Sequence, residues 1–218
     1  MEKCNSDNNQ QQSPVEPGLP SASTGPIQFI NIIGQIEGHS LLSDQSKTTK
    51  YEHIIPILSS IQENDNIKGF IVLLNTMGGD VEAGLAIAEM ISGISKPSAS
   101  LVLGGGHSIG IPLAVSTDRS MIASSATMTV HPIRINGLVI GVPQTYTYFR
   151  RMQERIIKFI CEHSNITRET LHEFLMETDE LANDMGKILV GQEAVDCGLI
   201  DQIGTISDAV NFIKEQIK

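Results

Sequence analysis

The chain has little of what several classes of protein depend on. Its three cysteines, Cys4, Cys161 and Cys197, are widely spaced and form no CxxC pair, which argues against a disulfide framework and against structural zinc. Only 4% of the residues are aromatic and none is Trp, so the core must be aliphatic. No apolar run approaches the roughly 18–20 residues that span a bilayer, and we expect no integral membrane segment.

Lys and Arg are also scarce. The sequence has 15 of them against 25 Asp and Glu, which gives a formal net charge of −10. Because affinity for nucleic acid depends on clustered Lys and Arg, nucleic acid is not an expected partner. The first residues contain no apolar stretch of the kind that secretory signals carry, and this predicts a cytoplasmic protein.

The length of 218 residues suits one domain with an appendage. Residues 1–26 are rich in Asn, Gln, Ser and Pro, a composition that buries too little to offset its ordering entropy. We therefore predict a disordered low-complexity tail at 1–26, with a docking arm or gate as the alternative, followed by a folded domain at 27–218.

Short β-rich runs alternate with helical patterns from Ile27 onward. Such alternation is typical of βαβ units, so the predicted fold class is α/β with a largely parallel sheet. The apolar run 68–74 is continuous, which indicates burial on both faces of the sheet. Strands are expected at 28–33, 68–74, 98–103, 120–123 and 127–130, and helices at 53–61, from Ser108, and at 81–91, 144–163, 168–176 and 207–217. The first strand is expected to end at Gly34, and Pro56 to kink the first helix.

Two glycine-rich turns follow predicted strands. Gly104-Gly105-Gly106-His107-Ser108-Ile109-Gly110 leads from a strand into a helix and places a serine at that helix's start. The serine is either a plain N-cap or a nucleophile beside free backbone amides. Gly78 and Gly79 end another strand, and they serve either the turn alone or the presentation of an N–H group to a ligand.

His131 follows an apolar run, one predicted strand after Ser108. A serine hydroxyl needs a base near neutral pH, and histidine suits that role. The alternative is a hydrogen-bonded structural histidine. A five-residue match of 106–110 to G-x-S-x-G also fits the nucleophile elbow of an α/β-hydrolase esterase, which would need His163 or His172 as its base.

A broader likeness covers residues 27–203, where five segments match a known family in the same order. They are Ile33-Gly34-Gln35-Ile36, Asn75-Thr76-Met77-Gly78-Gly79, 106–110, Val130-His131-Pro132 and Glu193-Ala194-Val195-Asp196-Cys197-Gly198-Leu199-Ile200-Asp201. In these segments the chain resembles the Clp protease proteolytic subunits, the ring-forming serine peptidases.

The resemblance implies roles for particular residues. Ser108 would be the nucleophile, His131 the base, and the N–H groups of Gly79 and Ile109 the oxyanion hole. The family's aspartate aligns with Gly186 unless two residues are inserted, which brings Asp184 into the third position of the triad, with Asp179 next. The resemblance implies no metal and no cofactor.

The resemblance also implies an α/β spiral of the Clp and crotonase kind, with helix 144–163 projecting as a handle that pairs with a second copy. Heptameric rings, two of which stack, would enclose a chamber for the hydrolysis of unfolded polypeptides by a core that needs no ATP. An AAA+ unfoldase partner and a role in translocating secretory preproteins are left open.

Other functions remain as alternatives. The poor match at the position of the family's aspartate suits a ring-forming scaffold in protein secretion, with little or no catalysis. A crotonase-type acyl-CoA enzyme would share the spiral, but it needs carboxylates rather than a Ser–His pair. A Ser/Lys dyad would use Lys158 as its base.

Overall fold

The computed structural model describes residues 25–43, 45–134, 140–178 and 185–217, so most of the predicted tail lies outside the described part.

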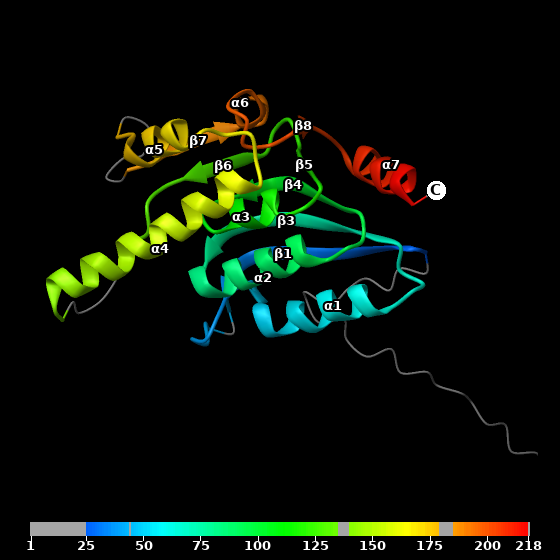
Figure 1. Cartoon of the computed structure of the whole chain (residues 1–218), viewed down its shortest axis with the longest axis horizontal. Coiled ribbons are helices and arrows are strands. Elements are labelled where there is room, and N and C mark those ends of the chain that lie inside the picture. Colours follow the sequence, from blue (N-terminus) through cyan, green and yellow to red (C-terminus); the bar gives the residue numbers. More distant parts are fainter. Residues whose placement is uncertain (1–24, 44, 135–139, 179–184, 218) are drawn as a thin grey trace, which may run out of the picture.

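A twisted sheet forms the centre of the fold (Figure 1). Its strands lie in the order β2-β1-β3-β4-β5-β8, and every neighbouring pair along this path is parallel. β6 extends β4 in parallel, and β7 pairs with β6 in antiparallel orientation. The bounds are β1 Ile27–Glu37, β2 Thr48–Lys50, β3 Gly69–Gly79, β4 Ser98–Gly106, β5 Arg119–Ile122, β6 Thr127–Val130, β7 Lys187–Val190 and β8 Gln202–Ile203. The α/β class and the largely parallel sheet are confirmed.

Two apolar cores lie on opposite faces of this sheet. Because side chains alternate along a strand, Val72 and Leu74 of β3 join the larger core, whereas Ile71 joins the smaller one. The helices α1 (Tyr51–Glu63), α2 (Val81–Gly93) and α3 (Gly110–Val115) contribute to the larger core, and α7 (Ile206–Gln216) to the smaller. The prediction that run 68–74 is buried on both faces is therefore confirmed.

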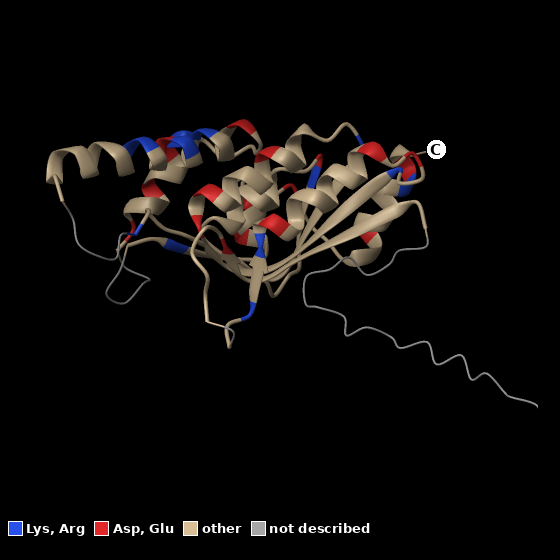
Figure 2. Ribbon diagram, turned by 90° about the horizontal axis from the view of Figure 1, so that it is seen from below, with Lys and Arg blue, Asp and Glu red and all other residues tan. Residues whose placement is uncertain are grey.

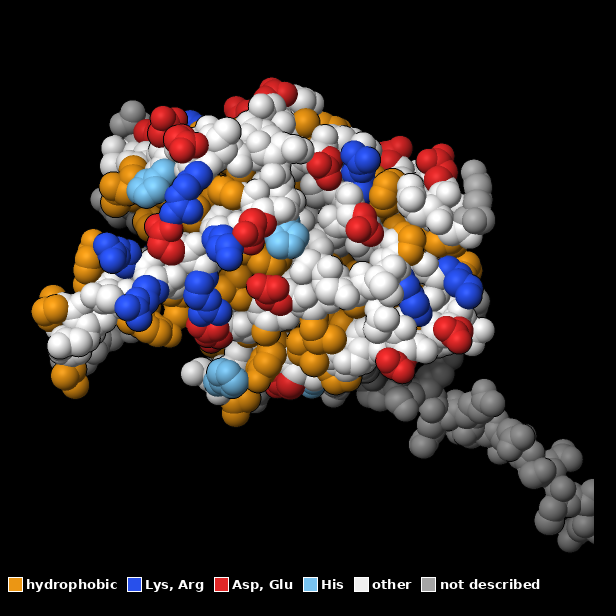
Figure 3. Space-filling view, in the orientation of Figure 1, with side chains coloured by type: hydrophobic (Ala, Val, Ile, Leu, Met, Phe, Trp, Pro, Cys, Tyr) orange, Lys and Arg blue, Asp and Glu red, His pale blue; other side chains and the backbone are white. Residues whose placement is uncertain are grey.

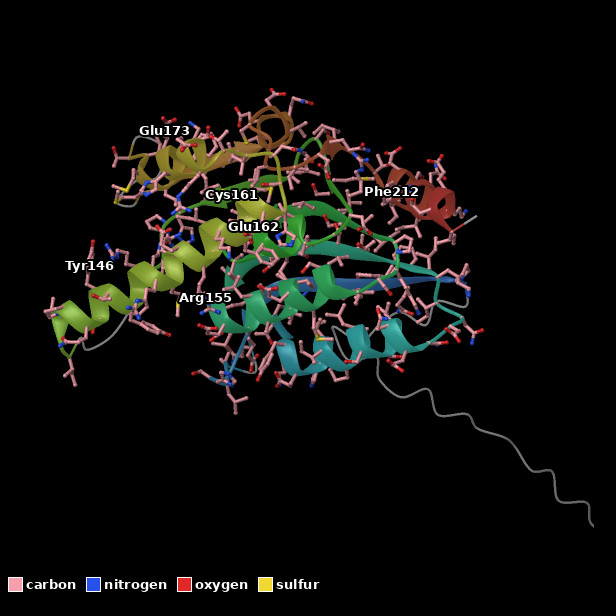
Figure 4. All side chains as sticks on the ribbon, viewed as in Figure 1. Tyr146, Arg155, Cys161, Glu162, Glu173 and Phe212 are labelled. Atoms are coloured by element: carbon pink, nitrogen blue, oxygen red, sulfur yellow. The ribbon has the colours of Figure 1, made fainter. Side chains whose placement is uncertain are left out.

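The long helix α4 (Val142–Glu162) crosses the body and projects beyond it at its N-terminal end (Figure 1). Tyr146 lies on the projecting part (Figure 4) and is exposed. The C-terminal part packs into the larger core through Ile157 and Ile160, beside α5 (Arg168–Met176). The predicted projecting helix is present.

The first strand does not end at Gly34, contrary to the prediction. β1 continues to Glu37 through a register shift between Gly34 and Gln35. Gly34 has a φ of +81°, and a Cβ there would lie 2.2 Å from the carbonyl oxygen of Lys47. The glycine thus lets the neighbouring chain approach within the sheet instead of ending the strand.

Four short elements had not been predicted: β2, β7, β8 and α6 (Gln192–Asp196). Each has two to five residues. Their positions depend on partners far away in the chain, as for β8 beside β5.

Two similar side-chain contacts join β5 to the segment before β8, and β4 to the segment before β5. Asp201 Oδ2 accepts from the backbone N–H of Ser120 at 2.8 Å and from its hydroxyl at 3.0 Å. Asp118 Oδ2 accepts in the same way from Ser98, at 2.8 and 2.9 Å. The first bridge anchors the segment that enters β8, whose ladder to β5 is short.

We expect Asp201→Ala to lower the free energy of unfolding by about 1 kcal/mol, because two charge-assisted hydrogen bonds are lost at a partly exposed site. Urea denaturation measures the change. Asp196→Ala is the matched control, since that carboxylate accepts from the exposed Gln192 amide within one helix. Equal effects of the two substitutions would contradict the anchoring role of Asp201.

Candidate active site

The carboxyl ends of β3, β4 and β6 meet at one edge of the sheet. Thr76 of β3 lies at their centre and is buried. Its hydroxyl donates to the carbonyl of Gly34 at 2.7 Å and accepts from the N–H of Gly78 at 3.0 Å. Its carbonyl accepts from the N–H of His107 at 3.1 Å. Sequence analysis missed this residue, although its place two residues before Gly78 in the matched segment 75–79 is the signal that could have found it.

Gly78 and Gly79 are required by close backbone approaches. Gly78 has a φ of +90°, and a Cβ there would lie 2.7 Å from Ser108 Cβ. Gly79 has a φ of +152°, and its Cβ would lie 2.2 Å from the carbonyl oxygen of Ile36. That carbonyl accepts from the N–H of Asp80 at 2.9 Å. Because N–H groups alternate in direction along a strand, the N–H of Gly79 faces away from β1.

Ser108 lies on a strained turn. Its φ of 55° is the one positive value at a non-glycine position in the described part of the chain. Such a conformation costs energy and is concentrated at functional sites. The N-cap position of α3 belongs to Ile109, and no side-chain cap is made there, so the alternative of a plain capping serine is wrong.

Ile109 presents an unused backbone donor. The N–H groups of Ser108, Gly110 and Ile111 donate to Thr129, His107 and Ser108, respectively, whereas among the described residues the N–H of Ile109 has no acceptor. The Ile109 side chain is buried against Gly84 of α2. The residue is thus fixed while its N–H remains available to a ligand.

Ser108, His131, Gly79 and Ile109 line one cavity of about 140 Å³. The remainder of its wall is mostly apolar and comes from α2, α3, β6, the segment after β6, α4 and α5, including Ile111, Val130, Ile156, Ile160, Leu171 and Leu175. Arg134 and Gln153 are its other polar lining residues. The structure therefore gathers four of the five predicted site residues around a pocket that suits an apolar side chain.

His131 follows β6 directly. Its Nδ1 lies 2.7 Å from the carbonyl oxygen of Pro132, and a carbonyl can only accept. Nδ1 therefore carries the proton in this contact, which leaves Nε2 as the basic nitrogen of the neutral ring. The Gln153 side chain of α4 accepts from the N–H of Ile133 at 2.8 Å, which ties the segment after the histidine to the cavity wall.

The other candidates lie elsewhere. Asp184 and Asp179 fall outside the described residues. Lys158 is exposed on α4, pairs with Glu162 at 3.7 Å and does not line the cavity, so a Ser/Lys dyad with Lys158 is not supported. His163 Nδ1 contacts the Phe159 carbonyl at 2.8 Å. Neither His163 nor the exposed His172 lines the cavity. The α/β-hydrolase hypothesis therefore has no base at this site.

Within the described ranges, no group of three or more His, Cys, Asp or Glu side chains is placed to hold a metal ion. Of the helices that the structure describes, none has the length and hydropathy to cross a membrane. Chemically, a hydroxyl, an imidazole and backbone amides around an apolar pocket can support acyl transfer.

Comparisons with known proteins agree with this architecture. The model of the Clp protease family matches residues 26–207. The translocation-enhancing protein TepA of Halalkalibacterium halodurans is 51% identical over 200 residues, which cover 92% of this chain and 78% of that protein. The proteolytic subunit of the ATP-dependent Clp protease of Streptococcus sanguinis is 28% identical over 160 residues, or 69% and 76% of the two chains. Proteolytic subunit 1 of Chlamydia muridarum is 27% identical over 139 residues, or 61% and 68%. The chain belongs to the Clp protease family.

We expect Gly78→Ala to destabilise the fold by about 2 kcal/mol, since an L-residue there adopts an unfavourable φ and its methyl group displaces Ser108. Gly93→Ala is the control, because a Cβ at Gly93 meets nothing within 4 Å. Urea denaturation of both variants measures the difference. Similar stability of the two variants would show that Gly78 does not carry the close contact.

Proposed function

We propose that the protein is a serine endopeptidase that hydrolyses peptide bonds in unfolded polypeptides. The observation that supports this most strongly is the shared cavity, which places Ser108, His131 and the N–H-bearing residues Gly79 and Ile109 around one space. Membership of the Clp protease family supports the same class of reaction.

In the proposed reaction the Ser108 hydroxyl attacks the scissile carbonyl while His131 Nε2 takes its proton. The carbonyl oxygen becomes an oxyanion and receives hydrogen bonds from the N–H groups of Gly79 and Ile109, each worth about 2.7–4 kcal/mol where a comparable donor has been removed. The imidazolium then returns the proton to the leaving amine, and water hydrolyses the acyl-enzyme by the same route. The contact with the Pro132 carbonyl favours the imidazole tautomer that these reaction steps need.

The apolar cavity wall favours a substrate with an aliphatic side chain beside the scissile bond, because burying it there removes apolar surface from water. An unfolded polypeptide exposes such side chains. We further propose a cytoplasmic ring, with the projecting end of α4 as a contact between copies, because exposed apolar residues gather there, among them Ile140, Val142, Tyr146 and Tyr148.

The name of the relative from Halalkalibacterium halodurans refers to enhanced translocation. A second candidate function is therefore a ring-forming scaffold in the secretion of preproteins, with weak or no catalysis. The two functions differ in one measurable property, the reactivity of Ser108.

A fluorophosphonate probe is expected to label the wild-type protein at Ser108, and Ser108→Ala is expected to abolish labelling and peptide hydrolysis without loss of stability. His131→Ala should slow both by at least about a hundredfold, since a general base contributes about 10²–10⁴-fold. Ser92→Ala and His172→Ala are controls at exposed positions. A wild-type protein that the probe fails to label would favour the scaffold.

The role of Asp184 is open to the same assay. Loss of a triad carboxylate can cost about 10⁴-fold in kcat. We expect Asp184→Asn to lower kcat steeply, by less than that extreme because the Pro132 carbonyl also contacts His131 Nδ1, and Asp179→Asn to have a mild effect. Full rate in both variants would show that Asp184 is not the third member of the triad and that another group, such as the Pro132 carbonyl, holds the ring.

A further inference from the structure

His107, which precedes the proposed nucleophile, has no part in the reaction above, yet its side chain is held in place. Nδ1 lies 2.9 Å from Thr129 Oγ1, and the ring is half-buried. It lies over Gly105, where a Cβ would come within 2.6 Å of Nε2. The glycine at 105 thus provides the room that this ring occupies.

The backbone beside the ring joins the same elements. The N–H of His107 donates to the carbonyl of Thr76 on β3, and the N–H of Ser108 donates to the carbonyl of Thr129 on β6, at 2.9 Å. Thr129 therefore receives one bond from the serine backbone and one contact from the histidine ring. It lies two residues before His131, so the two segments that carry the proposed nucleophile and base meet at this residue.

His107 also keeps its neutral form. Burial, and secondarily the charge of a protonated His131, lower the pKa of His107. When His131 gains a proton during the reaction, His107 therefore remains uncharged, and its contact with Thr129 does not have to change. The ring can hold the geometry through the whole cycle.

We propose that the His107–Thr129 hydrogen bond is a clamp that sets the spacing between Ser108 and His131, with His107 as a positioning residue. This inference rests on the proposed peptidase function. Small displacements matter in such a site, since a misplacement of about 1 Å can cost about 10²-fold in rate.

Two substitutions at His107 separate the clamp from simple packing. Asn places a polar atom where Nδ1 lies, whereas Gln places it nearer the position of Nε2. We expect His107→Asn to keep kcat within about twofold of wild type, and His107→Gln to lower it about tenfold with KM little changed. Equal activity of the two variants would overturn the proposal, as would a change confined to KM.

A double-mutant cycle tests the partner. Thr129→Val removes the hydroxyl and keeps the shape, and Thr129→Ser retains it. We expect Thr129→Val and His107→Leu each to lower kcat about tenfold, the double variant to lower it no further, and Thr129→Ser to be near wild type. An additive loss of about a hundredfold would show that the two side chains act independently and would overturn the proposal.

The pH–rate profile gives a further test. Its acid limb should persist in His107→Asn, because His131 is the proposed base. Disappearance of that limb would make His107 the base and overturn the proposal.

Failure of the clamp can be told from failure of the peptidase function. If wild type and Ser108→Ala are equally unreactive toward the fluorophosphonate probe, the proposed function is wrong whatever His107 does. A crystal structure of Thr129→Val requires no activity. A displaced His107 ring with a wider gap between residues 108 and 131 would support the clamp, and an unchanged arrangement would overturn it.

Discussion

The site depends on the close approach of Gly78 to Ser108. A Cβ at position 78 would lie 2.7 Å from Ser108 Cβ, so β3 and the turn after β4 can meet only because one of the two residues lacks a side chain. The Thr76 hydroxyl holds β3 against the Gly34 carbonyl on the other side. Beside this close approach, Ser108 has a φ of 55°. Strain of this kind persists only where the surrounding packing determines the backbone conformation.

Helix α4 connects the site to the surface of the molecule. Ile156 and Ile160 form part of the cavity wall. Figure 2 shows that Lys and Arg positions are concentrated along the middle of α4, and Figure 3 shows Lys and Arg side chains on the surface over this helix. Arg155, labelled in Figure 4, donates to both carboxylate oxygens of Glu82 on α2, at 2.7 and 3.2 Å. Burial of one face and solvation of the other are what the amphipathic pattern of this segment predicts. The helix is therefore both a wall of the cavity and a projecting arm.

The local signals in the sequence were strong where a residue's neighbours along the chain decide its structure. The apolar run 68–74 predicted a strand buried on both faces, and the segment around Ser108 predicted a turn between a strand and a helix. The predictions failed where contacts with distant parts of the chain decide the structure of a segment. Gly34 does not end its strand, because Lys47 approaches the sheet there, and β8 exists only beside β5. The Pro132 carbonyl that contacts His131 could not be predicted, since a backbone oxygen leaves no mark in the residue pattern.

The sequence by itself determined the α/β class, the positions of the main strands along the chain and the residue types available for chemistry, because hydrophobic period and glycine positions act locally. Only the tertiary structure decided which of these residues share a cavity. Gly79, Ser108, Ile109 and His131 come from three turns separated by many residues, and they meet because the carboxyl ends of β3, β4 and β6 lie at one edge of the sheet. Strand pairing sets that edge, and pairing depends on contacts between distant segments rather than on any local pattern.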